Sequence, residues 1–195
     1  YRNDGNGDNA GHVRMFDWNG TNWTQVGADI DGEAASDYSG YAVAISSDGS
    51  RVAIGAHGHD GNAGHVRMFD WNGTNWTQVG ADIDGEAAND MSGRSVSLSS
   101  DGSLVAIGAL FNDGNGDNAG HVRIFELNGT NWTQVGADID GEAATDYSGF
   151  SVSLNSDGSR VAIGAYRNDG NGDNAGHVRM FDWNGTNWTQ AGADI

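Results

Sequence analysis

The feature that most constrains this chain is a repeat that runs through its whole length. The string Gly-His-Val-Arg recurs at intervals of 53, 56 and 56 residues, beginning at Gly11, Gly64, Gly120 and Gly176. The first interval is short because the segment 57–65 lacks three residues that the other copies carry. Repeats of this size are typical of chains built from one supersecondary unit, in which stacked neighbours bury each other's faces.

Each repeat contains four short runs with the alternating pattern of β-strands. In the first full repeat these runs are 41–46, 51–56, 64–71 and 76–83. The Asp-Gly of "SSDGS" and the Asn-Gly of "NGTN" are hairpin signals between them. No segment shows a sustained period of 3.6 residues, so the sequence predicts an all-β protein.

The strand faces alternate large and small side chains, which suits sheets that are buried on both sides. In the run 51–56, Val52 and Ile54 oppose Ala53 and Gly55, so a bulky row of one sheet can fill the shallow row of its neighbour. Four strands in about fifty residues is typical of a β-propeller blade. We expect the small-residue run to lie innermost and the Trp-bearing run outermost. The small residues are Ala42, Ala44, Ser95, Ser97, Ser151 and Ser153.

The repeats predict about three and a half tandem four-stranded antiparallel blades. The expected units are an outer half-blade hairpin with its preceding loop at 1–38, followed by blades at 39–91, 92–147 and 148–195. Ring closure needs about four blades, so further repeats, other chains or copies of this chain are expected partners. An open, filament-like array of the same sheets is the alternative architecture.

The segment "YSGYAVAISSDGSRVAIGA", followed by "GHVRMFDW", resembles the FG-GAP repeat of integrin-α-type propellers and their bacterial relatives. Ser39 and Gly40 stand where that family has Phe-Gly, and 54–56 (Ile-Gly-Ala) stands where it has Val-Gly-Ala-Pro. The resemblance extends over the entire chain and implies a propeller, which in that family usually has seven blades. The family's calcium loop lies between the first two strands. Here 46–51 offers only one carboxylate, so no metal site is expected there.

The charge and the missing residue types exclude several classes of protein. The formal net charge is −18, which repels nucleic acid and anionic lipid and attracts divalent cations and basic partners. The chain has no Cys, which removes disulfides, thiol catalysis and Cys-based zinc sites. No apolar run approaches the ~18 residues of a membrane span. Neither nucleic-acid binding nor membrane insertion is therefore expected.

The stretch "NDGNGDNAGHV" occurs three times and invites a calcium interpretation through its Asp-x-Asn-x-Asp spacing. The twelfth position counted from Asp4 is Met15, so the bidentate Glu of an EF-hand is missing. The sequence favours an Asx/Gly turn and leaves calcium as the second interpretation. The candidate metal residues are Asp4, Asn6, Asp8, Asp113, Asn115, Asp117, Asp169, Asn171 and Asp173.

Two tryptophans flank three of the four "NGTN" hairpins, and Leu127 and Trp132 flank the remaining one. We expect these residues to pair across the strands. Aromatics at an outer edge can also stack on sugars, which makes the hairpins candidate carbohydrate-binding sites. The residues are Trp18, Trp23, Trp71, Trp76, Trp132, Trp183 and Trp188.

The same hairpins carry overlapping Asn-x-Thr acceptor patterns for glycosylation. The alternative is that Asn-Gly serves the turn and Thr the strand. The candidate asparagines are Asn19, Asn22, Asn72, Asn75, Asn128, Asn131, Asn184 and Asn187.

Acidic segments such as "DIDGEAASD" recur between the units. An enzyme, by contrast, normally has one asymmetric site rather than the same carboxylates in every unit. We therefore interpret them as charged connections between blades rather than as catalytic carboxylate pairs. The recurrent His12, His65, His121 and His177 lie one blade apart, which predicts a separate structural hydrogen bond for each.

The leading functional prediction is a non-enzymatic repeat module, extracellular or on the cell surface, for adhesion, recognition or structural assembly. Calcium is its candidate stabilising ion, and other surface proteins or glycans are candidate partners. A lectin-like propeller is the first alternative, and an enzyme with a site on the axial face is the second. No catalytic residue is predicted, because no nucleophile with an orienting base stands out.

Overall fold

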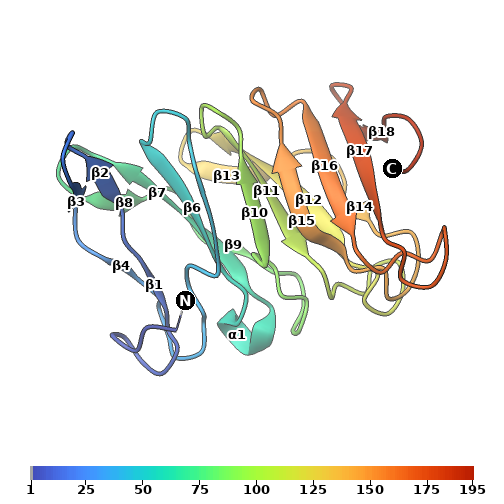
Figure 1. The fold of residues 1–195 in the computed structure, drawn as a ribbon, viewed down its shortest axis with the longest axis horizontal. Coiled ribbons are helices and arrows are strands. Elements are labelled where there is room, and N and C mark those ends of the chain that lie inside the picture. The colour runs from blue at the N-terminus through green and yellow to red at the C-terminus, as the bar shows by residue number, and fades with distance from the viewer. Residues whose placement is uncertain (1) are drawn as a thin grey trace.

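The computed structural model describes residues 2–195 as a row of antiparallel sheets that stand side by side along the long axis (Figure 1). The strands of the N-terminal half-unit are β1 (His12–Val13), β2 (Phe16–Trp18), β3 (Trp23–Gln25) and β4 (Ile30–Asp31). The first full sheet comprises β5 (Ala42–Ile45), β6 (Arg51–Ala56), β7 (His65–Trp71), β8 (Trp76–Gln78) and β9 (Ile83–Asp84). The second comprises β10 (Ser95–Leu98), β11 (Leu104–Ala109), β12 (His121–Asn128), β13 (Asn131–Gln134) and β14 (Ile139–Asp140). The third comprises β15 (Ser148–Leu154), β16 (Arg160–Ala165), β17 (His177–Trp183) and β18 (Trp188–Gln190).

The all-β prediction is confirmed, with strand orders β5-β6-β7-β8, β10-β11-β12-β13 and β15-β16-β17-β18. We call these three sheets blades A, B and C. The helix assigned in the described residues, α1 (His59–Asn62), is a single four-residue turn, and Asp60 and Gly61 inside it have positive φ values of 45° and 67°. It occupies the short loop between β6 and β7, where three residues are missing relative to the other repeats.

The run expected to be one outer strand, 76–83, is divided into two. Both β8 and β9 pair with β7, and the segment between them leaves the sheet edge. Gly80 lies in this segment with φ of +77°, a conformation that a continuous strand of L-residues cannot hold. Gly136 makes the same break between β13 and β14, with φ of +78°.

The core consists of large side chains of one blade set against small ones of the blade before it. Val105 and Ile107 of β11 pack against a cluster that includes Ala53 and Met68 of blade A. The next junction repeats the arrangement, with Val161 and Ile163 against Ala106 and Ile124. The predicted filling of shallow rows by bulky rows is confirmed.

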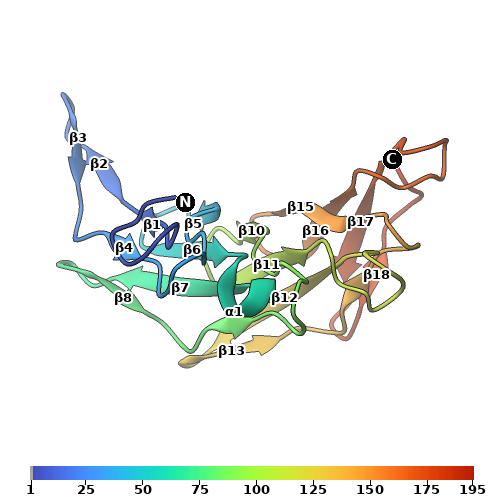
Figure 2. The same cartoon turned by 90° about the horizontal axis from the view of Figure 1, so that it is seen from below.

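The small-residue strands form the inner side of the array. Ser95 Oγ donates to the Gly149 carbonyl at 2.7 Å, and the Leu154 amide donates to Ser97 Oγ at 2.9 Å, so neighbouring inner strands are bonded directly. Figure 2 shows β5, β10 and β15 on the concave side of the arc and β8 and β13 on the convex side. The radial order expected from side-chain size is confirmed.

The described residues form an open arc whose two end faces are incompletely covered. At one end, Ile30 of the half-unit packs on Val52 and Ile54 of blade A, whereas the inner-strand residues Val43 and Ile45 are 55% and 52% exposed. At the other end, Ile195 is 79% exposed. Between residues 2 and 195, the structure contains no helix with the length and apolar character needed to cross a membrane.

Candidate functional site

The Asp/Asn/Gly loops predicted as turns or calcium sites are largely exposed, and they are held by one bond within the loop and one to the acidic connection that follows. Asp4 Oδ1 accepts from the Asn9 amide at 2.7 Å, and Asn6 Nδ2 donates to the Gly32 carbonyl at 2.7 Å. The later copies are similar, with 2.6 Å from Asn118 N to Asp113 Oδ1 and from Asn174 N to Asp169 Oδ1. These are the bonds of the turn interpretation, and the calcium site remains a prediction.

The residues that flank each hairpin lie opposite each other across the strands, as predicted; the pair is Leu127 and Trp132 in blade B and two tryptophans in the other hairpins. Trp18 faces Trp23 with ring centroids 5.6 Å apart, and Trp71 faces Trp76 at 5.4 Å. Trp76 has an additional contact, because its Nε1 donates to the Val26 carbonyl of the preceding unit at 3.0 Å. The equivalent bonds run from Trp132 to Val79 and from Trp188 to Val135, both at 2.9 Å. The second tryptophan of each blade therefore has a structural role at a junction.

The asparagines of the glycosylation patterns are all exposed at the hairpin tips. Asn19 Oδ1 accepts from the amides of Thr21 and Asn22 at 3.0 and 2.9 Å, which is the turn role expected for Asn-Gly. Glycosylation is compatible with this exposure and stays a prediction.

The acidic segments lie between the units, and one aspartate in each is buried. Asp37 is 2% exposed, and its Oδ2 accepts from the Ala34 amide at 2.8 Å, which closes the connecting loop. Asp90 and Asp146 repeat this role with Ala87 and Ala143. These aspartates hold the connections in shape.

The other acidic residues meet the recurrent histidines, an arrangement that the sequence analysis missed. His65 Nδ1 lies 4.0 Å from Glu33 Oε2 and 3.7 Å from Asp82 Oδ2. We call this set a junction triad, since it joins the loop that enters a blade to the outer half of that blade. The other junction triads are Glu86, His121 and Asp138, and Glu142, His177 and Asp194. In the second and third triads the candidate ligand atoms all lie within 4.8 Å of one another; at the first, this limit is met by His65 with Glu33 and His59, and by His65 with Asp82 and Asp84.

A constant spacing in the sequence could have indicated these triads. Every histidine precedes its aspartate by 17 residues, from His12 and Asp29 to His177 and Asp194. His12 Nδ1 lies 3.9 Å from Asp29 Oδ2, but no earlier unit within residues 2–195 supplies a glutamate, so this pair is a half-site.

Each carboxylate of a junction triad has a neighbour at its other oxygen. Gln78 Nε2 donates to Asp82 Oδ1 at 2.6 Å, and Arg67 Nη1 lies 3.5 Å from Glu33 Oε1. The same partners recur as Gln134 on Asp138, Arg123 on Glu86, Gln190 on Asp194 and Arg179 on Glu142. The oxygens nearest the histidine, Oδ2 and Oε2, are thereby directed toward the imidazole.

The histidines of the triads are buried without the hydrogen bonds that we expected of them. His65 is 0% exposed, and among the described residues neither of its ring nitrogens has a hydrogen-bond partner. His121 Nδ1 is unpartnered in the same sense. Burial lowers the pKa of His65 to about 4, and burial together with the nearby Arg123 lowers the pKa of His121 to about 4. Both imidazoles are therefore neutral at pH 7.

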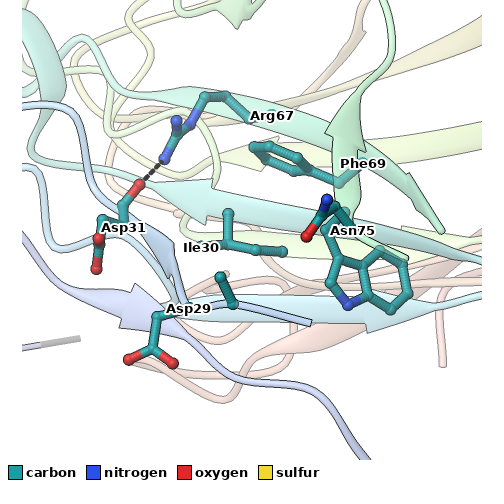
Figure 3. A pocket seen from close by; sticks show the side chains of 8 residues that line it. Asp29, Ile30, Asp31, Arg67, Phe69 and Asn75 are labelled. Atoms are coloured by element: carbon teal, nitrogen blue, oxygen red, sulfur yellow. Dashed lines mark hydrogen bonds between the residues drawn. The ribbon is translucent and has the colours of Figure 1, made fainter. Parts of the chain in front are cut away.

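A pocket of about 330 Å³ lies at the junction between the half-unit and blade A, between Asp29, Ile30 and Asp31 on one side and Arg67, Phe69 and Trp76 on the other (Figure 3). Trp76 and Phe69 supply aromatic walls, and Arg67 donates to the Asp31 carbonyl at 2.6 Å across it. The equivalent pocket at the next junction has a volume of about 190 Å³ and contains Trp132 and Arg123. Aromatic faces next to Asp, Asn and Arg side chains can in principle hold a polar, disc-shaped ligand such as a sugar.

Comparison with solved structures supports the fold. A candidate 6-phosphogluconolactonase from Bacteroides uniformis superimposes with a TM-score of 0.65 at 14% identity, over 95% of this chain and 49% of that one. A second candidate 6-phosphogluconolactonase, from Bacteroides fragilis, gives a TM-score of 0.54 at 15% identity, over 78% of this chain and 38% of that one. The chain therefore spans half or less of the length of these structures, and identities this low show the fold alone.

Comparison with protein families identifies the repeats themselves. The FG-GAP repeat family matches residues 81–125 and 137–181, and no curated protein matches the sequence. Each matched segment runs from an acidic connection through the first three strands of the following blade. Residues 81–125 and 137–181 are thus similar to FG-GAP repeats, and they lie in an open series of antiparallel propeller-type blades.

Proposed function

We propose that this chain is a non-enzymatic, extracellular or cell-surface repeat module that serves recognition, adhesion or structural assembly by adding further repeats or copies of itself. The proposal rests on side chains that are exposed at the ends of the arc, whereas the equivalent side chains are covered at the internal junctions. Calcium binding in the Asp/Asn/Gly loops would stabilise such a module and belongs to the same proposal.

The N-terminal end presents the contacts that later blades use. Phe16 is 43% exposed, whereas its equivalent Phe69 is 7% exposed against the preceding unit. Trp23 is 66% exposed, whereas its equivalent Trp76 donates to the preceding unit. A preceding repeat, or the C-terminal end of another copy, would cover both residues in a head-to-tail contact.

Association through these end faces is expected to depend on concentration and to weaken when the N-terminal face is charged. Phe16→Glu should raise the dissociation constant about tenfold or more, because a carboxylate would be buried without a partner. Sedimentation equilibrium measures the association, and Thr21→Glu on the exposed hairpin tip is the control that adds the same charge away from the face. A native chain that remains monomeric at its highest soluble concentration would contradict self-assembly.

Carbohydrate binding is the second candidate, and the repeated junction pockets favour it. Trp76 and Trp132 line pockets that also contain Asn75 and Asn131, a combination suited to stacking on a sugar and bonding its hydroxyls. The exposed Trp23 hairpin offers a further aromatic surface.

A glycan array separates these two candidates. We expect a glycan signal from the exposed hairpin to fall on Trp23→Ala, and a signal from the junction pockets to fall on Asn75→Ala and Asn131→Ala. Far-UV circular dichroism should stay unchanged in all three variants, because these side chains are exposed. An array that shows no signal with the native chain would remove the carbohydrate proposal and leave the assembly proposal standing.

An enzymatic function has the weakest support. The structural neighbours are described as candidate 6-phosphogluconolactonases, but their similarity extends only to fold. The inner strands β5, β10 and β15 contain Ala, Gly, Ser, Val, Ile, Leu and Phe, so no acid or base side chain arises from the strands nearest the axis. A non-enzymatic role is accordingly the proposal.

A further inference from the structure

We infer that each junction triad binds a first-row divalent cation of the zinc class, which ties the loop entering a blade to the outer half of that blade. The ligands assigned to the first site are His65 Nδ1, Glu33 Oε2 and Asp82 Oδ2. The chain would hold three such ions, one at each complete triad. This inference is independent of the calcium loops and extends beyond the proposed assembly function.

The first argument is the chemistry of the facing atoms. At every complete triad the imidazole Nδ1 faces one oxygen of each of two carboxylates, and at the second and third triads all three atoms lie within 4.8 Å of one another. Oxygens of ionised carboxylates can only accept. The distances of 3.6 to 4.0 Å between Nδ1 and the oxygens exceed those of a hydrogen bond. Two metal–ligand bonds of about 2.1 Å span up to about 4.2 Å, so an ion fits between Nδ1 and each facing carboxylate oxygen.

The second argument is the burial of the imidazole. His65 is 0% exposed and His121 is 1% exposed, and among residues 2–195 the Nδ1 atom of each lacks a hydrogen-bond partner. Leaving a buried polar atom unpaired is costly, and native proteins rarely repeat such a defect. A coordinate bond from Nδ1 to a cation would satisfy this atom in His65 and in His121.

The third argument is the set of groups that hold the carboxylates. Metal ligands are commonly oriented by donors at their far side. At the second triad, Gln134 Nε2 donates to Asp138 Oδ1 at 2.6 Å, and Arg123 Nη1 lies 3.6 Å from Glu86 Oε1. Both groups leave the oxygen that faces His121 available.

The ligand types select the class of ion. Imidazole nitrogen combined with carboxylate oxygen suits zinc and related first-row ions, whereas calcium prefers six to eight oxygen ligands. Three protein ligands leave a coordination position for water. The binding would couple to stability, since an ion bound only to the folded junction favours that junction by mass action.

The test is the stoichiometry of zinc bound to the 195-residue chain, measured by equilibrium dialysis after treatment with a chelator. We expect three zinc ions per native chain and two for Asp138→Asn. The matched control is Asp29→Asn, which changes the same repeat position at the half-site and should leave the stoichiometry at three. If Asp138→Asn does not fold, Glu86→Gln should also lower the stoichiometry to two zinc ions per chain.

Cobalt(II) provides a spectroscopic second measurement at the same sites. Its visible d–d bands should report nitrogen and oxygen ligation, lose about one third of their intensity in Asp138→Asn, and persist in excess calcium. No saturable zinc binding, as expected if water alone bridges the triads, would overturn the inference, as would a stoichiometry unaffected by Asp138→Asn and Glu86→Gln. Sedimentation in chelator keeps this outcome separate from the test of self-assembly.

Discussion

Replacing Gly108 by alanine is expected to lower the free energy of unfolding by about 3 kcal/mol, because it forces blades B and C apart. A Cβ at this position in β11 would overlap the carbonyl oxygen of Gly149 in β15, and also Ser95 Oγ. The serine can rotate away, but the Gly149 carbonyl is backbone and cannot. The measurement is urea denaturation followed by circular dichroism and tryptophan fluorescence.

The matched control is Gly164→Ala in blade C, at the equivalent position of β16. There a Cβ would meet only the Oγ of Ser151 at close range, because no further blade follows within the described residues. Its effect is expected to stay within about 1 kcal/mol. Equal destabilisation by the two alanines would show that the loss arises within a blade and would contradict the close backbone approach between blades.

The architecture was predictable because the repeat specifies it redundantly. The alternation of Val52 and Ile54 with Ala53 fixed the strand faces, and the Asp-Gly and Asn-Gly turns fixed the reversals. The order of strands from concave to convex side followed from side-chain size alone. The break in the outer strand was not predicted, because a glycine such as Gly80 can also occur inside a strand. Only its positive φ in the structure shows that the strand is interrupted there.

The candidate site was less predictable because its parts lie in different motifs. Glu33 belongs to a connecting loop, His65 to the start of β7, and Asp82 to the break before β9. Their meeting depends on how β9 pairs with β7, which brings the end of a repeat back to the start of its third strand. Sequence reasoning treated the histidines and the acidic segments separately, so it expected an ordinary hydrogen bond at each histidine.

Replacing Trp132 by alanine is expected to cost about 3 kcal/mol, since it removes both packing and a bond at the junction of blades A and B. Trp132 packs against the cluster that contains Val105 and Ile107, and its Nε1 donates to the Val79 carbonyl at 2.9 Å. Losing the indole would leave a cavity and an unpaired carbonyl at once. The midpoint of urea denaturation should fall while the far-UV spectrum of the folded state is retained.

Trp23→Ala tests whether that cost belongs to the junction or to the hairpin. Trp23 occupies the same repeat position and faces Trp18 across the strands, where Trp132 faces Leu127. Trp23 is 66% exposed, because no earlier unit within residues 2–195 covers it. The loss of a cross-strand pair alone is worth up to about 1 kcal/mol. A cost of Trp132→Ala beyond that amount therefore measures what this tryptophan contributes by reaching back to the preceding blade. If both cost the same, the hairpin pair would carry the stability, and the junction contact would be incidental to the stacking of the repeats.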